Sequence, residues 1–192
     1  MKECASTGRQ RVIEAAAAML ARHGLRGISI REVSKFADAP LGSTYHHFPG
    51  GKNQIVTEAI HWAGAQASEQ LQRCLQADAR QGLGLFVSHW RERLTQSHFR
   101  AGCPIVAAAI EAQHEEDGEP IKEAVAQVFG HWQQLIADHL MAQGQADASA
   151  RACALGIIAS IEGAIVLCRA HQSSEPLDAV LACLPRLMGT AE

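Results

Sequence analysis

Apolar residues recur every three to four positions along almost the whole of this chain, which is the spacing of one face of an α-helix. No segment shows the strict alternation of a half-buried strand, and clusters of β-branched residues are scarce. The sequence therefore predicts an all-α fold. The first such apolar stripe comprises Val12, Ala15, Ala16, Met19 and Leu20.

Glycine and proline divide this helical pattern into about nine helices, because both residues end helices. The first three helices, of which the second and third are short, precede the Pro49-Gly50-Gly51 turn. We therefore expect a three-helix head at residues 1–51 and a helical body at residues 52–192. The expected helices are 7–23, 30–37, 41–47, 52–74, 79–97, 103–113, 119–143, 148–172 and 176–188.

The composition, 47% hydrophobic and 19% charged, is typical of a soluble globular protein. The first ten residues are polar and do not resemble a signal peptide. The longest apolar stretch, residues 152–168, contains Glu162, which favours a buried helix over a membrane span. The six cysteines include no Cys-x-x-Cys pair, so we expect neither a disulfide framework nor a metal site. These features indicate a reduced, cytoplasmic protein without a cofactor.

The charge of the chain is unevenly distributed. Residues 1–52 hold eight basic and four acidic side chains, a net charge of +4, whereas the rest carries −7 of the total of −3. A basic head on an acidic body points to an anionic partner such as nucleic acid. Chance clustering is the alternative explanation.

The segment from Ser29 to Phe48 has the pattern of a helix-turn-helix. Ser29 and Glu32 form a capping box at the start of its first helix. Pro40 ends that helix, since the residue before a proline disfavours the α conformation. The second helix, 41–47, is short and rich in small polar and aromatic residues, which suits an element that enters the major groove of DNA.

Hydroxyl, imidazole and ammonium groups around this second helix are candidates for DNA contacts. We expect Tyr45 to pack its ring inward and direct its hydroxyl at a phosphate, and Lys52 to add charge at the N-terminus of the next helix. Alternatively, Tyr45, His46 and His47 are ordinary residues of a helix surface. The expected DNA contacts are Ser29, Gly42, Ser43, Thr44, Tyr45, His46, His47 and Lys52, while Val33, Ala37 and Phe48 are expected in the core.

These residues carry a resemblance to a known family. The segments 24–33 and 39–48, with the motif Gly-x-x-Tyr-x-His-Phe and the following Lys52, resemble the TetR family of ligand-responsive repressors. Gly50-Gly51 and Gly102-Cys-Pro resemble its LmrA/YxaF-like subgroup. Leu41 departs from the polar or basic residue often found at that position. The resemblance implies a DNA-reading third helix, a ligand pocket in the body and a homodimer that binds a palindromic operator.

Aromatic, sulfur and carboxyl side chains recur in the body, as in a mostly apolar effector pocket with a few polar anchors. Packing within the core is the alternative for each of them. Glu162 lies in an apolar run and needs a partner, which is an arginine, a ligand or water at a dimer edge. The candidate ligand contacts are Phe86, Trp90, Cys103, Glu111, Phe129, Trp132 and Glu162.

The last two expected helices, 148–172 and 176–188, carry apolar stripes that could form half of a four-helix dimer interface. Their burial within one chain is the alternative. The leading hypothesis is thus a dimeric repressor released from DNA by a small apolar or aromatic ligand.

Three other functions compete with this hypothesis. The first is a thiol- or metal-responsive regulator with the same head, and the second is a helical adaptor without a DNA role. The third is an enzyme, built on Cys103 with His98 or His131. No third group or oxyanion site is positioned for such a pair, and we expect no enzyme.

Overall fold

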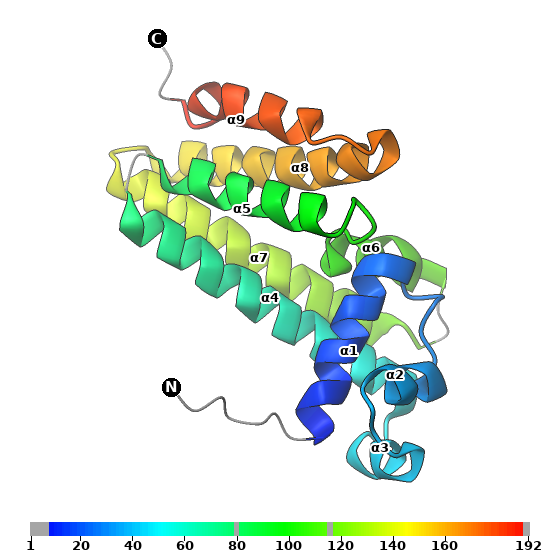
Figure 1. Ribbon diagram of the computed structural model, residues 1–192. Coiled ribbons are helices and arrows are strands. Elements are labelled where there is room, and N and C mark those ends of the chain that lie inside the picture. Colours follow the sequence, from blue (N-terminus) through cyan, green and yellow to red (C-terminus); the bar gives the residue numbers. More distant parts are fainter. Residues whose placement is uncertain (1–7, 79–80, 115–116, 190–192) are drawn as a thin grey trace. The chain divides into compact units, whose positions relative to one another are not determined.

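The computed structural model describes residues 8–78, 81–114 and 117–189. Within these residues it contains nine α-helices and one short 3₁₀ helix and no strand (Figure 1), which confirms the all-α expectation. The elements are α1 (Gly8–His23), α2 (Ile30–Phe36), α3 (Leu41–His47), α4 (Gly51–Ala77), α5 (Gly82–Gln96), α6 (Pro104–Glu111), η1 (Ala112–His114), α7 (Glu119–Ala142), α8 (Asp147–His171) and α9 (Glu175–Leu187).

The observed helix ends differ from the expected ones by a few residues, and local chemistry explains the larger differences. Helix α4 continues past its expected end at residue 74 to Ala77, because no glycine or proline lies between residue 74 and Gly82. Helix α6 tightens into η1 after Glu111, as helix C-termini often do. The expected starts at Thr7 and at residue 79 lie outside the described residues.

The chain forms two compact units. The first comprises the residues up to Ala65 together with Pro104–Val128, and the second comprises Gln66–Cys103 together with the residues from Phe129 onward. Helices α4 and α7 each contribute to both units. These units group residues by proximity. The expected boundary after residue 51 instead divides a DNA-binding head from a helical body, and it stays a prediction.

In the first unit, α1 is the central helix, and α2, α3 and α6 pack against it. Its apolar stripe is buried, as the periodicity predicts, with Val12, Ala16 and Leu20 almost fully excluded from solvent. Arg9 of α1 pairs with Glu58 at 2.6 Å and lies 5.0 Å above the ring of Phe48. These contacts join α1 to α4 and to the C-terminal end of α3.

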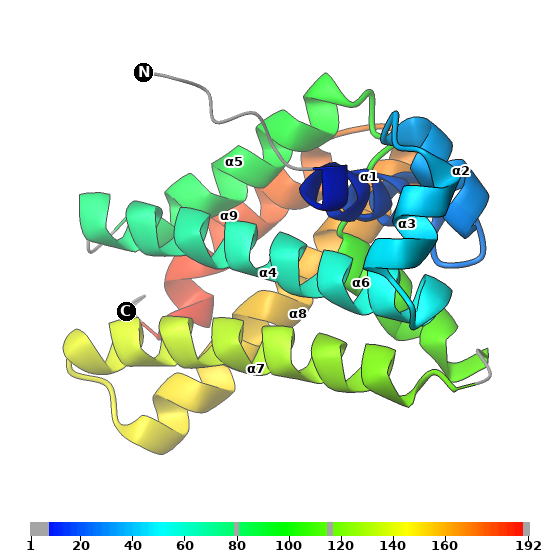
Figure 2. The ribbon, with the colours of Figure 1, turned by 90° about the horizontal axis from the view of Figure 1, so that it is seen from below.

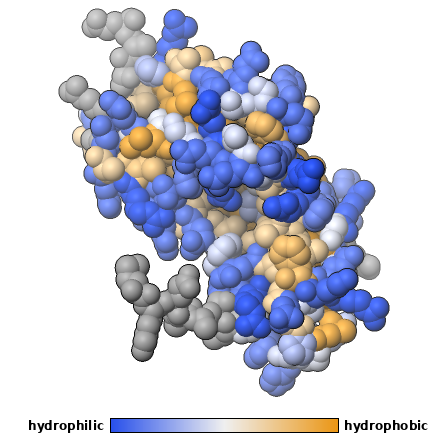
Figure 3. Space-filling view, in the orientation of Figure 1, coloured by the Kyte–Doolittle hydropathy of each residue, from blue (hydrophilic) through white to orange (hydrophobic). Residues whose placement is uncertain are grey.

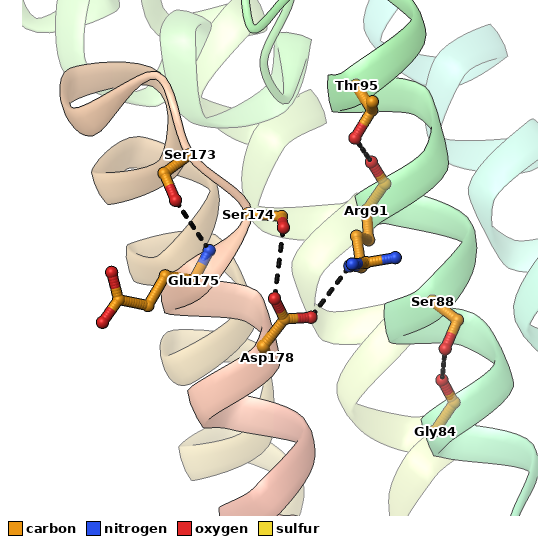
Figure 4. Close-up of polar contacts among 8 residues, drawn as sticks. All are labelled: Gly84, Ser88, Arg91, Thr95, Ser173, Ser174, Glu175 and Asp178. Carbon is orange, nitrogen blue, oxygen red and sulfur yellow. Dashed lines mark hydrogen bonds and ion pairs between the residues drawn. The ribbon is translucent and has the colours of Figure 1, made fainter.

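In the second unit, α5, α8 and α9 lie side by side (Figures 1 and 2). An ion pair joins two of these helices: Arg91 Nε of α5 lies 2.8 Å from Asp178 Oδ1 of α9. The Ser174 hydroxyl donates to the other carboxylate oxygen of Asp178 at 3.1 Å (Figure 4). These partly exposed polar contacts orient α9, while buried Leu177 and Leu184 provide its apolar anchor.

Helix α8 is apolar on two sides. One side, with Ile157, Ile161 and Ile165, is buried. The other remains exposed in the single chain, where Leu155 is 57% and Val166 is 50% accessible. By length and composition α8 could also cross a membrane, but the core helix of a soluble protein passes the same test. The residues that the structure describes leave this apolar side exposed.

The surface of the protein is mostly hydrophilic on the face that Figure 3 shows. On the face drawn in Figure 3, hydrophilic residues predominate and apolar patches lie among them. Such separate patches are normal for a globular protein.

Candidate nucleic-acid interface and ligand cavity

Helix α2 begins with the expected cap. The backbone N–H of Glu32 donates to the Ser29 hydroxyl oxygen at 3.2 Å, which confirms half of the capping box. The glutamate side chain does not reach back to the backbone, but accepts a hydrogen bond of 3.1 Å from the same hydroxyl. Ser29 is exposed, so its cap leaves it accessible to a phosphate.

Helices α2 and α3 are joined by a buried pair of hydroxyls. Ser34 donates to Thr44 Oγ1 at 2.9 Å, and both side chains are at most 2% exposed. The Thr44 hydroxyl in turn donates to the carbonyl of Pro40. This placement corrects the expectation that Thr44 contacts DNA: its side chain faces the interior and fixes the angle between the two helices.

The turn between α2 and α3 is held from α1. The guanidinium of Arg11 donates to the carbonyl of Ala37 and to that of Asp38, each at 3.2 Å. Asp38 has a φ of 48°, in the left-handed region that aspartate tolerates better than most residues. Arg11 therefore stabilises the turn, because these carbonyls at the C-terminal end of α2 accept its hydrogen bonds and interact favourably with its positive charge.

The exposed side of α3 carries most of the expected DNA contacts. Ser43, His46 and His47 are exposed, and the rings of the two histidines lie 5.6 Å apart. Gly42 is exposed too, and a Cβ added there would meet nothing within 4 Å. Tyr45 is 55% exposed, so its ring does not pack inward as expected.

Two further observations complete the head. Lys52 is the second residue of α4 and is half-buried. Val33, Ala37 and Phe48 are buried, which confirms their assignment to the core. The exposed polar side of α3 is thus mounted on an apolar support.

Glu111, expected in a ligand pocket, lies in the first unit. Its carboxylate accepts a 2.8 Å hydrogen bond from the backbone N–H of Arg26, in the loop after α1. It also fills the space that a Cβ would need at Gly24, whose φ is +71°. Glu111 is not among the residues that line the cavity of the second unit described below, and its contacts bridge residues 85 positions apart, which no local pattern reveals.

A small cavity lies in the second unit between parts of α4, α5, α7 and α8. It has about 10 Å³ of open interior space, room for about one water molecule. Four of the seven expected ligand contacts line it together, namely Phe86, Trp90, Trp132 and Glu162. Its other lining residues are Leu71, Ile136, Ile158 and Ile161.

Glu162 is the one charged side chain among the residues that line this cavity, and it is only 9% exposed. Burial raises the pKa of its carboxyl from 4.5 to about 7, while a hydrogen bond from the Cys103 thiol partly opposes the rise. Within the described part of the chain, its Oε2 atom has no hydrogen-bond partner. A buried polar atom without a partner is costly and needs an explanation.

The cavity shares its walls with the remaining candidates. The indole N–H of Trp132 donates to the Ser68 hydroxyl at 3.1 Å, which fixes the orientation of the ring. Phe129 packs its ring against the edge of Trp132, with 5.5 Å between the centroids, and is not a lining residue. Cys103 is buried and reaches the site through its bond to Glu162.

Comparisons with known proteins agree with this geometry. Residues 12–59 match the model for bacterial regulatory proteins of the tetR family, and residues 79–183 match that for the C-terminal domain of LmrA/YxaF-like transcriptional regulators. An uncharacterized HTH-type transcriptional regulator of Mycobacterium tuberculosis is 34% identical over 94% of this chain and 93% of its own length. The chain belongs to the TetR family.

Two further relatives support the assignment. The HTH-type transcriptional regulator LmrA of Bacillus subtilis is 27% identical over 94% of this chain and 96% of its own length. The crystal structure of a regulatory protein TetR from Rhodobacter sphaeroides has the same fold, with a TM-score of 0.84, 24% identity and coverage of 95% and 99% of the two chains. This protein is therefore a DNA-binding transcriptional regulator of a non-enzymatic family, with an LmrA/YxaF-like C-terminal domain.

Sequence reasoning missed several residues of this TetR-family site. Ser34, Arg11 and Ser68 position other residues through contacts that local patterns do not signal. The aliphatic lining of the cavity carries a weak signal, since Ile158, Ile161 and Glu162 share the i, i+3, i+4 spacing of one helix face. That spacing is the same for any core-facing stripe, so it does not by itself identify a pocket.

Proposed function

We propose that this TetR-family regulator is a repressor that binds a palindromic operator as a homodimer and leaves it when a small ligand binds. The observation that carries the proposal is the exposed polar side of α3, with Ser43, Tyr45 and His46, on a buried apolar support. Such a helix fits the major groove, and a dimer reads two half-sites about one DNA turn apart.

A second group of features supports phosphate binding by the head. Ser29 and Lys52 carry a hydroxyl and an ammonium group at helix N-termini, where phosphates commonly bind, and His47 adds an imidazole at the C-terminal end of α3. Exposed Arg31 and Lys35 add positive charge on α2. We expect these groups to set the register of the protein on its operator. We also expect the protein to act in the cytoplasm, where the DNA lies.

The experiment that tests DNA binding is footprinting and mobility-shift titration on the DNA upstream of the coding region at low salt. Tyr45→Ala and Lys52→Ala should each weaken binding, because they remove a groove contact and a phosphate contact. Arg73→Ala is the matched control, since this exposed basic residue belongs to the second unit. Absence of binding by the unaltered protein would refute the proposal.

The exposed side of α8 supports the homodimer. Exposed residues follow one another there at intervals of three or four positions, so they form one face of the helix. Small residues on this face allow a partner helix to approach closely, and α9 presents Ala179, Ala182 and Cys183 beside it. The exposed residues of α8 that form this face are Leu155, Ala159, Gly163, Val166 and Ala170.

Two glycines provide a matched test of this interface. Gly163 of α8 and Gly130 of α7 are both exposed and helical, and a Cβ at either would meet nothing within 4 Å. Gly163→Glu should therefore leave the monomer intact but separate the dimer, whereas Gly130→Glu should not. Sedimentation velocity measures both, and an unchanged dimer in Gly163→Glu contradicts the proposed interface.

The cavity in the second unit supports release by a ligand. It is lined by aromatic and aliphatic side chains with one polar anchor, which is the usual makeup of a small-molecule site. A ligand that binds one conformation better than the other shifts the population toward it, and operator affinity changes accordingly. A screen of small aromatic compounds for release of the operator tests this step.

Thiol-responsive control is the second candidate, and the electrostatic interaction between the buried Cys103 thiol and the Arg93 guanidinium favours it, because a nearby positive charge stabilises a thiolate. The buried Cys168 thiol fits it less well: burial raises its pKa and nearby Asp178 adds to the rise, against a hydrogen bond with the Leu177 backbone, and a raised pKa disfavours the reactive thiolate. Unchanged operator affinity after treatment with peroxide or diamide would exclude this candidate.

A further inference from the structure

The Glu162 carboxyl group combines three properties that a structural side chain does not need. It is buried, its Oε2 atom has no hydrogen-bond partner within the described residues, and it lines a cavity. A carboxyl that served packing alone would be replaced at lower cost by an apolar residue, since an unsatisfied buried oxygen costs about 1–3 kcal/mol. The group is therefore placed to meet something that enters the cavity.

The surroundings of Glu162 favour positive charge. Three aromatic side chains, Phe86, Trp90 and Trp132, line the same cavity. The faces of aromatic rings attract cations, and tryptophan does so most strongly. The ring of Trp90 already binds one cation in this way, because the guanidinium of Arg93 lies 4.6 Å from its centroid.

We propose that this cavity is the effector site and that its effector is a small aromatic amine, bound as the ammonium ion between the aromatic rings and the Glu162 carboxylate. The inference rests on the proposed ligand-controlled function and names the chemical class of its ligand. An ammonium group donates the hydrogen bond that Oε2 lacks and supplies the charge that a buried carboxylate needs.

Other ligand classes fit the cavity less well. An anion would face the Glu162 carboxylate, and a hydrocarbon would leave Oε2 without a partner. A neutral alcohol would supply the hydrogen bond but would leave the carboxylate charge uncompensated. The Cys103 thiol, which bonds to this carboxyl, is only a weak donor.

The open space in the cavity, about 10 Å³, requires the site to widen when the amine binds. Phe86 and Trp90 of α5 and Ile158 of α8 line the cavity, and a ligand would have to displace lining side chains such as these. Because the ligand binds only the widened cavity, its binding favours a second conformation of the protein.

Three compounds of matched size test the proposal on the full-length protein: 2-phenylethylamine, 2-phenylethanol and ethylbenzene. Titration calorimetry at neutral pH should show that the amine binds at least about tenfold more tightly than the alcohol, and the alcohol more tightly than ethylbenzene. Equal binding of the amine and the alcohol would overturn the proposal, as would no binding of the amine. This comparison needs no variant and so does not depend on how a substitution folds.

A variant then assigns the preference to the carboxyl. Glu162→Gln keeps the shape but removes the charge, and should lose most of the preference for the amine over the alcohol. Glu175→Gln, at an exposed position, should retain it. A full preference in Glu162→Gln would place the cation elsewhere and overturn the assignment.

A mobility-shift assay separates the failure of this inference from the failure of the proposed function. Operator binding without ligand is measured first by mobility shift, and its absence refutes the repressor while leaving the calorimetric result readable. If the protein binds the operator but no amine releases it, the effector is of another class and the inference fails.

Discussion

Replacing Glu162 with glutamine should change how the stability of the protein depends on pH. In the folded chain burial raises the pKa of this carboxyl to about 7, against a hydrogen bond from Cys103 that lowers it. In the unfolded chain the carboxyl is solvated and titrates near its ordinary value of 4.5. The two states therefore bind different numbers of protons between these two pH values.

The direction follows from proton linkage. Between pH 4.5 and about pH 7 the unfolded chain has released the proton that the folded chain still holds, so the free energy of unfolding falls as pH rises. Each pKa unit corresponds to about 1.4 kcal/mol, and the whole rise therefore costs about 3 kcal/mol of stability. This cost is absent below pH 4.5 and complete above about pH 7. Glutamine does not titrate, so the variant escapes it.

Urea denaturation of both proteins, at one protein concentration and at a series of pH values, measures this effect. The difference in unfolding free energy between Glu162→Gln and the unaltered protein should shift by about 3 kcal/mol in favour of the variant as pH rises through this range. The difference cancels the titration of groups that both proteins share, such as the histidines. Glu175→Gln, an exposed control, should give a nearly constant difference. A constant difference for Glu162→Gln would refute the reasoning.

Three other substitutions test the head. Thr44→Val breaks the buried bond from Ser34 and should cost about 1–2 kcal/mol of stability in urea denaturation; no loss would mean that this bond does not hold α2 to α3. Glu111→Ala removes the acceptor of the Arg26 amide and should cost about 1 kcal/mol, to be compared with Glu111→Gln, which keeps an acceptor. Lys52→Ala should reduce the slope of log affinity against log salt by about one, and an unchanged slope would exclude a phosphate contact.

The helices of this protein could be predicted because their signals are local. Periodic apolar residues, the Ser29 cap and the break at Pro40 act within a few positions of the chain, and each is observed. The motif at Gly42–Phe48 likewise lies within one short segment and indicates the family without any knowledge of packing. Its support residue Phe48 is buried as expected.

The roles of individual side chains were less accessible, because they depend on which side of a helix is covered. Helix α3 has only seven residues, about two turns, which is too short for the sequence pattern to show which side of the helix is buried. Thr44 proved to be buried and Tyr45 exposed, the reverse of what small size and aromatic character suggested. Only the docking of α3 on α1 and α2 settles that choice.

The sequence alone determined the all-α class, the helix limits to within a few residues, the helix-turn-helix and the family. The tertiary structure decided which polar groups meet and which are buried: the exposed Glu111–Arg26 bond, the buried Ser34–Thr44 bond, and the Oε2 atom of Glu162, which has no partner among the described residues and lies beside aromatic rings. Helix formation depends on neighbours in the chain, whereas burial depends on segments tens of residues apart, and the energy of a polar group changes most when it leaves water.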